Sequence, residues 1–141
     1  MEIQEIRRVI GIDYGDSRIG LALSDPMQII AKPSGIIHNK GEDHVLNELK
    51  SIIAENRVEK IVVGMPFGMK GNDTVQTKKV RGFIDLLEQN FDMQIISVDE
   101  RLSTKSAISS LVQQKIDTGR EKHRVDETAA AIILQEFLDS K

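Results

Sequence analysis

The sequence predicts an α/β fold built on a mixed five-stranded sheet, with three strands antiparallel and then two parallel. Near the N-terminus, three strand-like apolar runs follow one another with only short turn-forming links, which is typical of antiparallel hairpins. Two further strand-like runs then alternate with amphipathic segments, which is typical of parallel strands joined by helices. The length of 141 residues suits one domain spanning residues 1–141.

Each predicted strand is a short run rich in branched apolar residues and bounded by turn formers. The links YGDS and DPMQ separate the first three runs, and NKGED follows the third. The fourth run ends in front of a glycine-rich segment. The predicted strands are Arg7–Ile12, Ile19–Ser24, Ile29–Ile37, Lys60–Val63 and Gln94–Val98.

Four segments place apolar residues on one face at the helical period. The first of them carries Val45, Leu49 and Ile53 on such a face, and Ser103 is a suitable N-cap for the third. With the strands they give the order β-β-β-α-β-α-β-α-α. The predicted helices are Asp43–Asn56, Asp73–Gln89, Ser103–Gln114 and Val125–Leu138.

The composition excludes several classes of site and partner. With no cysteine, the chain has no disulfide, thiolate metal site or cysteine nucleophile. No apolar run approaches the roughly 20 residues of a membrane helix, and the N-terminus lacks the pattern of a secretory signal, so we expect a cytoplasmic protein without membrane contact. The net charge of −3 argues mildly against nucleic acid as a partner. Residues 115–124 are locally basic, which suits either a solvated loop or a phosphate contact.

Three carboxylates occupy positions at which ligands collect in α/β folds. Asp13 follows the first predicted strand, Glu100 follows the fifth, and Asp126 lies in the first turn of the last predicted helix. The carboxyl ends of parallel strands share one edge of a sheet, so these side chains are expected to meet there. Converging carboxylates repel one another unless a cation compensates, and Mg²⁺ accepts a site of few carboxylates. Two such ions roughly 3.5–4 Å apart could support phosphodiester cleavage.

Each carboxylate also has a purely structural interpretation. Asp126 could complement the dipole of its helix, Asp13 could shape the turn before Gly15, and Glu100 could pair with Arg101. Because all three acids lie at strand ends or a helix start, the sequence favours a shared site over three separate structural roles.

Four motifs carry a family resemblance. The segments GIDYGDSRIGLALSD, VVGMPFGMKGNDT, DERLST and VDETAAAIILQEFL resemble, in the same order, those of the YqgF family, also called RuvX. The match extends from Val9 to Leu138, and DERLST with VDETAAAIILQ is its most specific part. The resemblance implies a three-layer RNase H-like fold related to the RuvC resolvases. It also implies an acid triad that binds two Mg²⁺ or Mn²⁺ ions.

Carried over to this sequence, the implied catalytic and metal-binding triad is Asp13, Glu100 and Asp126. RuvC-type enzymes carry two acids one helical turn apart in the last helix, whereas this chain has Ala129 after that turn. The missing fourth acid argues against resolvase activity more than against nuclease activity. Asp16 and Asp99 are candidates for positions outside the triad, in the outer shell of the site.

Several basic residues are candidates for contact with nucleic acid. The segment GMPFGMKGNDT lies between a strand and a helix, so its backbone N–H groups and Lys70 could meet a phosphate, although it lacks the spacing of a P-loop. Arg18 in the first hairpin is another candidate, together with Arg101 and Lys105 in and after DERLS.

The resemblance implies a metal-dependent nuclease acting in maturation of the 5′ end of the small-subunit (16S) ribosomal RNA precursor during ribosome biogenesis. His123 is a candidate general base that this mechanism does not require. A DNA junction endonuclease and a non-catalytic RNA-binding assembly factor remain open. An actin-like ATP-binding module would need two such domains, and the low aromatic content of 4% favours recognition of the backbone over base stacking.

Overall fold

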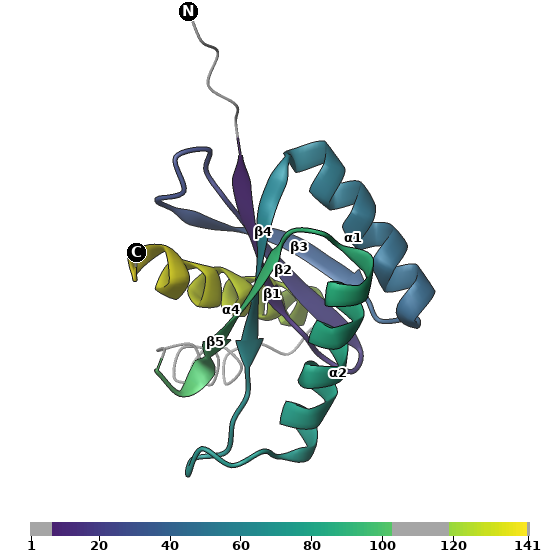
Figure 1. Cartoon of the computed structure of the whole chain (residues 1–141), viewed down its shortest axis with the longest axis vertical. Coiled ribbons are helices and arrows are strands. Elements are labelled where there is room, and N and C mark those ends of the chain that lie inside the picture. Colours follow the sequence, from purple (N-terminus) through teal and green to yellow (C-terminus); the bar gives the residue numbers. More distant parts are fainter. Residues whose placement is uncertain (1–6, 103–118, 141) are drawn as a thin grey trace, which may run out of the picture.

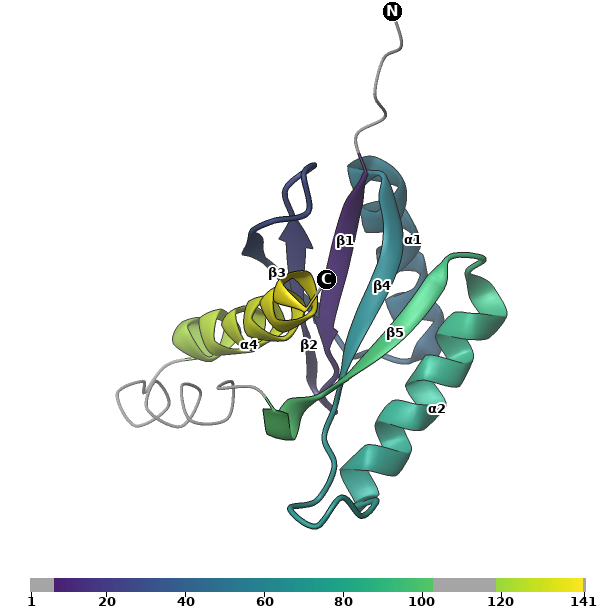
Figure 2. The same cartoon turned by 60° about the vertical axis from the view of Figure 1, so that its left-hand side comes forward.

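The computed structural model describes residues 7–102 and 119–140, together with the side chains of 7–101 and 125–140. A central five-stranded sheet has helices on both faces (Figures 1 and 2). The predicted helix Ser103–Gln114 lies outside the described residues.

The sheet has the predicted mixture of directions. Its strand order is β3-β2-β1-β4-β5, with β1 at the centre. β1 is antiparallel to β2, which is antiparallel to β3, whereas β1, β4 and β5 run parallel. The strands are β1 (Arg8–Asp13), β2 (Arg18–Ser24), β3 (Ala31–His38), β4 (Val58–Met65) and β5 (Gln94–Asp99).

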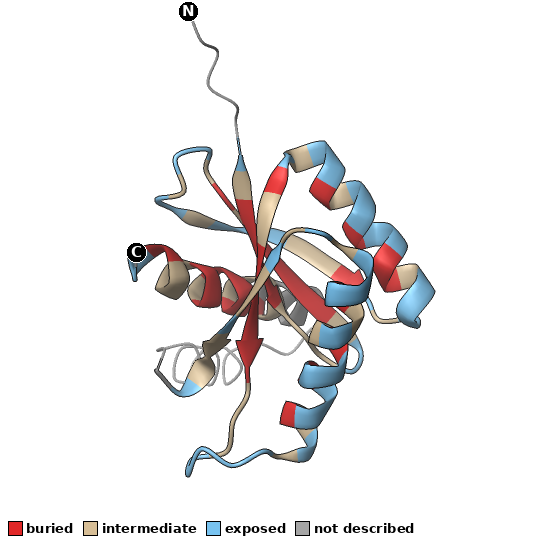
Figure 3. Ribbon diagram, in the orientation of Figure 1, coloured by how far each residue is buried: buried red, intermediate tan, exposed pale blue. Residues whose placement is uncertain are grey.

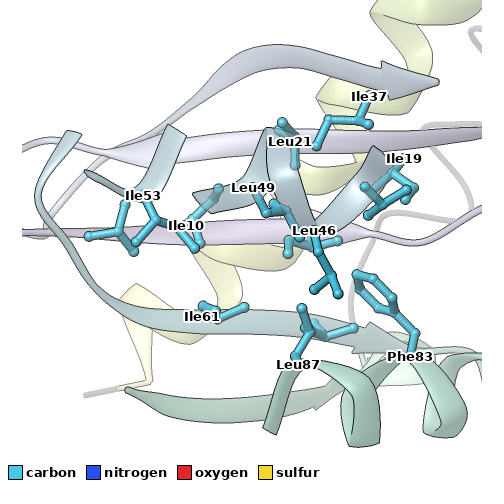
Figure 4. Packing of buried hydrophobic residues seen from close by; sticks show 14 of the residues in the cluster. Ile10, Ile19, Leu21, Ile37, Leu46, Leu49, Ile53, Ile61, Phe83 and Leu87 are labelled. Atoms are coloured by element: carbon cyan, nitrogen blue, oxygen red, sulfur yellow. The ribbon is translucent and has the colours of Figure 1, made fainter. Parts of the chain in front are cut away.

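One face of the sheet is covered by α1 (Glu42–Asn56) and α2 (Val75–Asn90) (Figure 1). α1 ends where Arg57 adopts a left-handed conformation and its N–H bonds to the Ile53 carbonyl. α2 begins with a capping box in which the Thr74 and Thr77 side chains bond each other's backbone N–H groups. Their apolar faces pack on residues of β1, β2 and β4 in the larger core cluster (Figure 4).

Among the described residues, the other face is covered by α4 (Gly119–Asp139) (Figure 2). Its apolar residues form a second core cluster with alternate residues of β1, β2 and β4. The approach is close, because a Cβ at Gly11 would lie 2.7 Å from Leu134 Cβ. The central strands are therefore buried on both faces (Figure 3).

The start of α4 corrects the sequence prediction. The helix begins at Gly119 rather than at Val125, so Asp126 lies about two turns inside it and not in its first turn. Residues 119–124, expected in a loop, are helical. The apolar period marks where the helix meets the sheet, whereas the preceding REKHR consists mainly of good helix formers, which favour an earlier start of the helix. The helix-dipole role considered for Asp126 is thereby removed.

The third strand also starts later than predicted, at Ala31 instead of Ile29. Asp25 accepts hydrogen bonds from the backbone N–H groups of Met27, Ile29 and Ile30, which closes these residues into a turn. Ile29 and Ile30 are 60% and 54% exposed, although their apolar character suggested a buried strand. No helix in the described part of the chain is both long enough and apolar enough to cross a membrane.

Candidate active site

Asp13 is the last residue of β1 and faces α4. Side chains alternate along a strand, and Val9 of the same strand belongs to the core under α4. Gly11 also faces this helix, because a Cβ there would contact Leu134. Asp13 therefore projects to the α4 side of the sheet, at the carboxyl end of its central strand.

Gly20 brings α4 close to Asp13. In the antiparallel pair of β1 and β2, Gly20 is the direct partner of Asp13, and directly opposed residues project to the same face. A Cβ at Gly20 would overlap the carbonyl oxygen of Asp126. The absence of a side chain at Gly20 thus lets the backbone of Asp126 lie on the strand position next to Asp13.

On the other side of Asp13, Gly64 leaves room for Glu100 in the same way. Ile12 is paired with Val63, so Asp13 and Gly64 follow at the same edge of neighbouring parallel strands. A Cβ at Gly64 would lie 2.6 Å from Glu100 Oε1, so the Glu100 side chain covers this position. Glu100 opens the short 3-10 helix η1 (Glu100–Leu102), directly after β5.

The structure therefore assembles the three predicted acids on one face of one sheet edge. Asp13, Glu100 and Asp126 are each half-buried and come from β1, η1 and α4. Their backbones are brought together by Gly20 and Gly64, which sequence reasoning had read only as parts of strands or motifs. Gly20 inside a predicted strand and Gly64 directly after another are the signal that could have revealed this close approach.

Arg18 engages the acid on α4. Its Nε donates a 2.6 Å hydrogen bond to Asp126 Oδ2, and the two side chains are 31% and 24% exposed. Arg18 lies two residues before Gly20 in β2, so both face α4. The sequence predicted Arg18 as a phosphate contact, whereas the structure places it beside a candidate metal ligand.

The donor chemistry of the site fits a hard divalent cation. Carboxylate oxygens are the ligands that Mg²⁺ prefers, and three carboxylates on one face need positive charge to compensate them. Arg18 supplies one positive charge at Asp126. Within residues 7–102 and 119–140, no three acidic or histidine side chains are grouped tightly enough to hold one ion. The three carboxylates thus lie at one edge of the sheet, but they do not surround the position of a single ion.

Asp99, the neighbour of Glu100, is engaged by Arg101. The guanidinium donates from Nε and Nη2 to the Asp99 carboxylate, with a shortest distance of 2.7 Å. Mainly through these hydrogen bonds, Arg101 lowers the pKa of Asp99 below its ordinary value. The guanidinium carbon also lies 5.6 Å from the centroid of the Phe67 ring. Arg101 thus fastens the end of β5 to the loop after β4.

The other predicted residues are spread around this edge. Lys70 lies exposed in the loop between β4 and α2, close to Gly71, which has a φ of +81°. Asp16 pairs with Lys79 of α2 at 3.2 Å and so belongs to the opposite side of the sheet from α4. Lys105 and the His123 side chain lie outside the described residues.

Comparison with known proteins places this geometry in a family. Residues 7–140 match the model of the family described as "RuvX: Holliday junction resolvase". The chain belongs to the RuvX family. A relative from Desulforamulus reducens, called "Putative pre-16S rRNA nuclease", is 42% identical over 94% of this chain and 97% of its own length. A relative from Roseiflexus sp. with the same name is 40% identical over 95% of each chain.

Solved structures support the fold of this RuvX-family chain. Thermus thermophilus RuvC in complex with a Holliday junction substrate matches with a TM-score of 0.57 and 13% identity, over 94% of both chains. The fowlpox virus resolvase in complex with Holliday junction DNA matches with a TM-score of 0.57 and 12% identity, over 94% of this chain and 97% of its own. The predicted RNase H-like fold is therefore confirmed.

Proposed function

We propose that this RuvX-family protein is a divalent-metal-dependent nuclease that cleaves phosphodiester bonds in RNA. The observation that carries the proposal is the assembly of Asp13, Glu100 and Asp126 on one face of one sheet edge. The family description and the names of relatives about 40% identical support nuclease chemistry.

In this proposal, Asp13, Glu100 and Asp126 would hold Mg²⁺ or Mn²⁺. The bound metal would activate a water for attack on the phosphorus and stabilise the departing oxygen. Asp13, at the centre of the set, is expected to serve as a shared ligand. Arg18 binds one oxygen of Asp126 and thereby orients this carboxylate toward the sheet edge. Gly20 and Gly64 keep the carboxylates next to one another by leaving room above the sheet.

The proposed substrate is the small-subunit (16S) ribosomal RNA precursor, as the names of the relatives suggest. Its 5′ end is the part that the family resemblance of the sequence motifs implies. A DNA junction is the second candidate, favoured by the family description and by the RuvC and fowlpox resolvase folds. Both substrates would be cleaved by the same phosphodiester chemistry, so the three acids do not distinguish between them. The choice must depend on how each nucleic acid fits the rest of the protein.

The first experiment compares Asp13→Asn with wild type on a short RNA that spans the precursor 5′ end, at increasing Mg²⁺ and Mn²⁺. We expect metal-dependent cleavage by wild type and at least about 100-fold slower cleavage by the variant, since a metal ligand is lost. Asp43→Asn is the matched control, because Asp43 is an exposed acid in the first turn of α1.

Full cleavage by Asp13→Asn would refute the assignment of this carboxylate. A four-way DNA junction measured in parallel decides between the substrates, since preferential cutting of the junction would overturn the RNA proposal. If neither naked nucleic acid is cut, the same pair of variants is assayed on precursor ribosomal particles. Absence of cleavage there as well would favour an assembly factor without catalysis.

A further inference from the structure

A cavity of about 230 Å³ opens between α1 and α2, one residue away from the candidate active site. Tyr14 lines it and directly follows Asp13 in the chain. Tyr14 packs against the core cluster under α1 and α2, whereas Asp13 faces α4. The cavity thus begins at the strand end that carries the carboxylates, but on the other side of the sheet.

The inner lining is aromatic and apolar. The rings of Tyr14 and Phe83 stack with centroids 4.5 Å apart and planes inclined by 29°, and Val45 and Leu86 add aliphatic surface. Phe83 lies on the side of α2 that faces the sheet, among the residues of the main core (Figure 4). The volume is below the roughly 300 Å³ at which pockets for drug-sized ligands begin, so it suits one heterocycle and not a whole nucleotide.

The rim is polar and carries groups of different hydrogen-bonding type. Asn39 Nδ2 donates to Tyr14 Oη at 3.3 Å and to the Gly15 carbonyl at 3.0 Å, which turns its amide oxygen into the remaining acceptor. Glu42 and Lys79 also line the cavity, and the Lys79 ammonium group pairs with Asp16 at 3.2 Å. The rim therefore combines an amide with two charged residues around an apolar interior.

We propose that this cavity binds one nucleobase of the nucleic acid strand whose phosphate lies at Asp13. A base combines flat apolar faces with a polar edge, and single-stranded RNA is recognised by stacking on aromatic side chains with hydrogen bonds to that edge. The cavity has the same combination: an aromatic interior and a polar rim with an acceptor amide and the charged residues Glu42 and Lys79. The identity of the ligand rests on the proposed nuclease function, whereas the binding of a base is tested without it.

Gly82 offers a direct way to fill the cavity. It lines the cavity from α2, and a Cβ added there meets no atom within 4 Å. Gly82→Leu is expected to occupy the space while raising the helix propensity of α2, so the fold should be kept. Gly82→Ala is the matched control, because it makes the same change to the helix with only one methyl group.

Tyr14 is the single tyrosine of the chain, so its ring resonances form an isolated NMR probe of the cavity. The four nucleoside 5′-monophosphates are titrated into the metal-free protein, with ribose 5-phosphate as the ligand that lacks a base. We expect a saturable upfield shift of the Tyr14 ring signals for at least one nucleotide, with a Kd in the millimolar range. Gly82→Ala should keep this binding, Gly82→Leu should weaken it at least tenfold, and ribose 5-phosphate should leave the signals in place.

No shift with any nucleotide, an equal shift with ribose 5-phosphate, or unchanged binding by a folded Gly82→Leu variant would each overturn the proposal. This readout needs no cleavage, so it separates the two proposals. If the protein binds bases at Tyr14 but cuts no substrate, the proposed nuclease function is refuted and the base-binding cavity is supported. If the protein cuts its substrate but binds no base at Tyr14, the nuclease function is supported and the base-binding cavity is refuted.

Discussion

At the scale of single residues, the candidate site depends as much on missing side chains as on charged ones. Gly20 admits the backbone of Asp126 and Gly64 admits the side chain of Glu100. Any larger residue at Gly20 would have to displace α4 from the sheet, because its obstacle is a backbone carbonyl and not a flexible side chain. Positions that look like ordinary strand residues therefore control the distance between the acids.

We expect Gly20→Ala to lower the free energy of unfolding by about 1–3 kcal/mol, the usual cost of overpacking. Urea denaturation followed by circular dichroism measures the change. Gly82→Ala is the control, since its added methyl group meets nothing within 4 Å and should raise stability by up to about 1 kcal/mol. Equal stabilities for Gly20→Ala and wild type would show that α4 does not depend on the close approach at Gly20.

At the scale of elements, the turn between β2 and β3 shows how one carboxylate organises a segment. Asp25 accepts backbone hydrogen bonds from three residues of the turn, and Gln28 adopts a left-handed conformation within it. Gln135 of α4 bonds to the Ile29 carbonyl and to the Ala31 N–H, so the helix also holds this turn against the sheet. The turn is thus fixed by polar contacts, although its sequence DPMQII is largely apolar.

This turn should make stability depend on pH. Hydrogen bonds from the backbone N–H groups of Ile30 and Ile29 lower the pKa of Asp25 below its ordinary value of 3.8. The ionised carboxylate therefore stabilises the folded state above this value, and the contribution disappears as the pH falls through the lowered pKa. Urea denaturation between pH 7 and pH 2.5 should show a stability gap between wild type and Asp25→Asn that narrows in acid. A gap independent of pH would contradict this role of Asp25.

At the scale of the whole molecule, charge limits how the protein can hold nucleic acid. The net charge is −3, and two of the four predicted nucleic-acid contacts, Arg18 and Arg101, are paired with Asp126 and Asp99. These two predicted contacts are thus already paired with carboxylates and are less free to displace counterions from a phosphate backbone. Binding should depend more on the shape of the site, its metal ions and the partner that presents the substrate.

The salt dependence of binding tests this view. For single-stranded RNA, each neutralised phosphate contributes about −0.7 to the slope of log K against log salt concentration. With about two effective contacts, we expect a slope between about −1 and −2, measured by fluorescence anisotropy from low to moderate salt. Lys70→Ala should make the slope shallower, and the exposed Lys50→Ala on α1 should leave it unchanged. A wild-type slope steeper than about −4 would indicate a basic surface beyond these residues.

Much of the fold could be predicted because its signals are local. The apolar run VIGI, the turn formers after each early strand and the helical period of VDETAAAII depend on neighbouring residues only. The mixed sheet and the order of the described elements were confirmed, whereas the predicted helix Ser103–Gln114 lies outside the described residues. The predicted boundaries were wrong where polar contacts outweigh apolar pattern. Asp25 turns Ile29 and Ile30 outward, and good helix formers extend α4 back to Gly119.

The sequence by itself determined the class of fold, the family and the identity of the three acids as candidates, because these depend on residue type, period and motif order. Only the tertiary structure decided that Asp13, Glu100 and Asp126 share one face, that Arg18 binds Asp126, and that Tyr14 opens a cavity on the other side of the sheet. These contacts join residues far apart in the chain, such as Arg18 and Asp126. Their distances depend on strand register and on the close packing of α4, which no local pattern encodes.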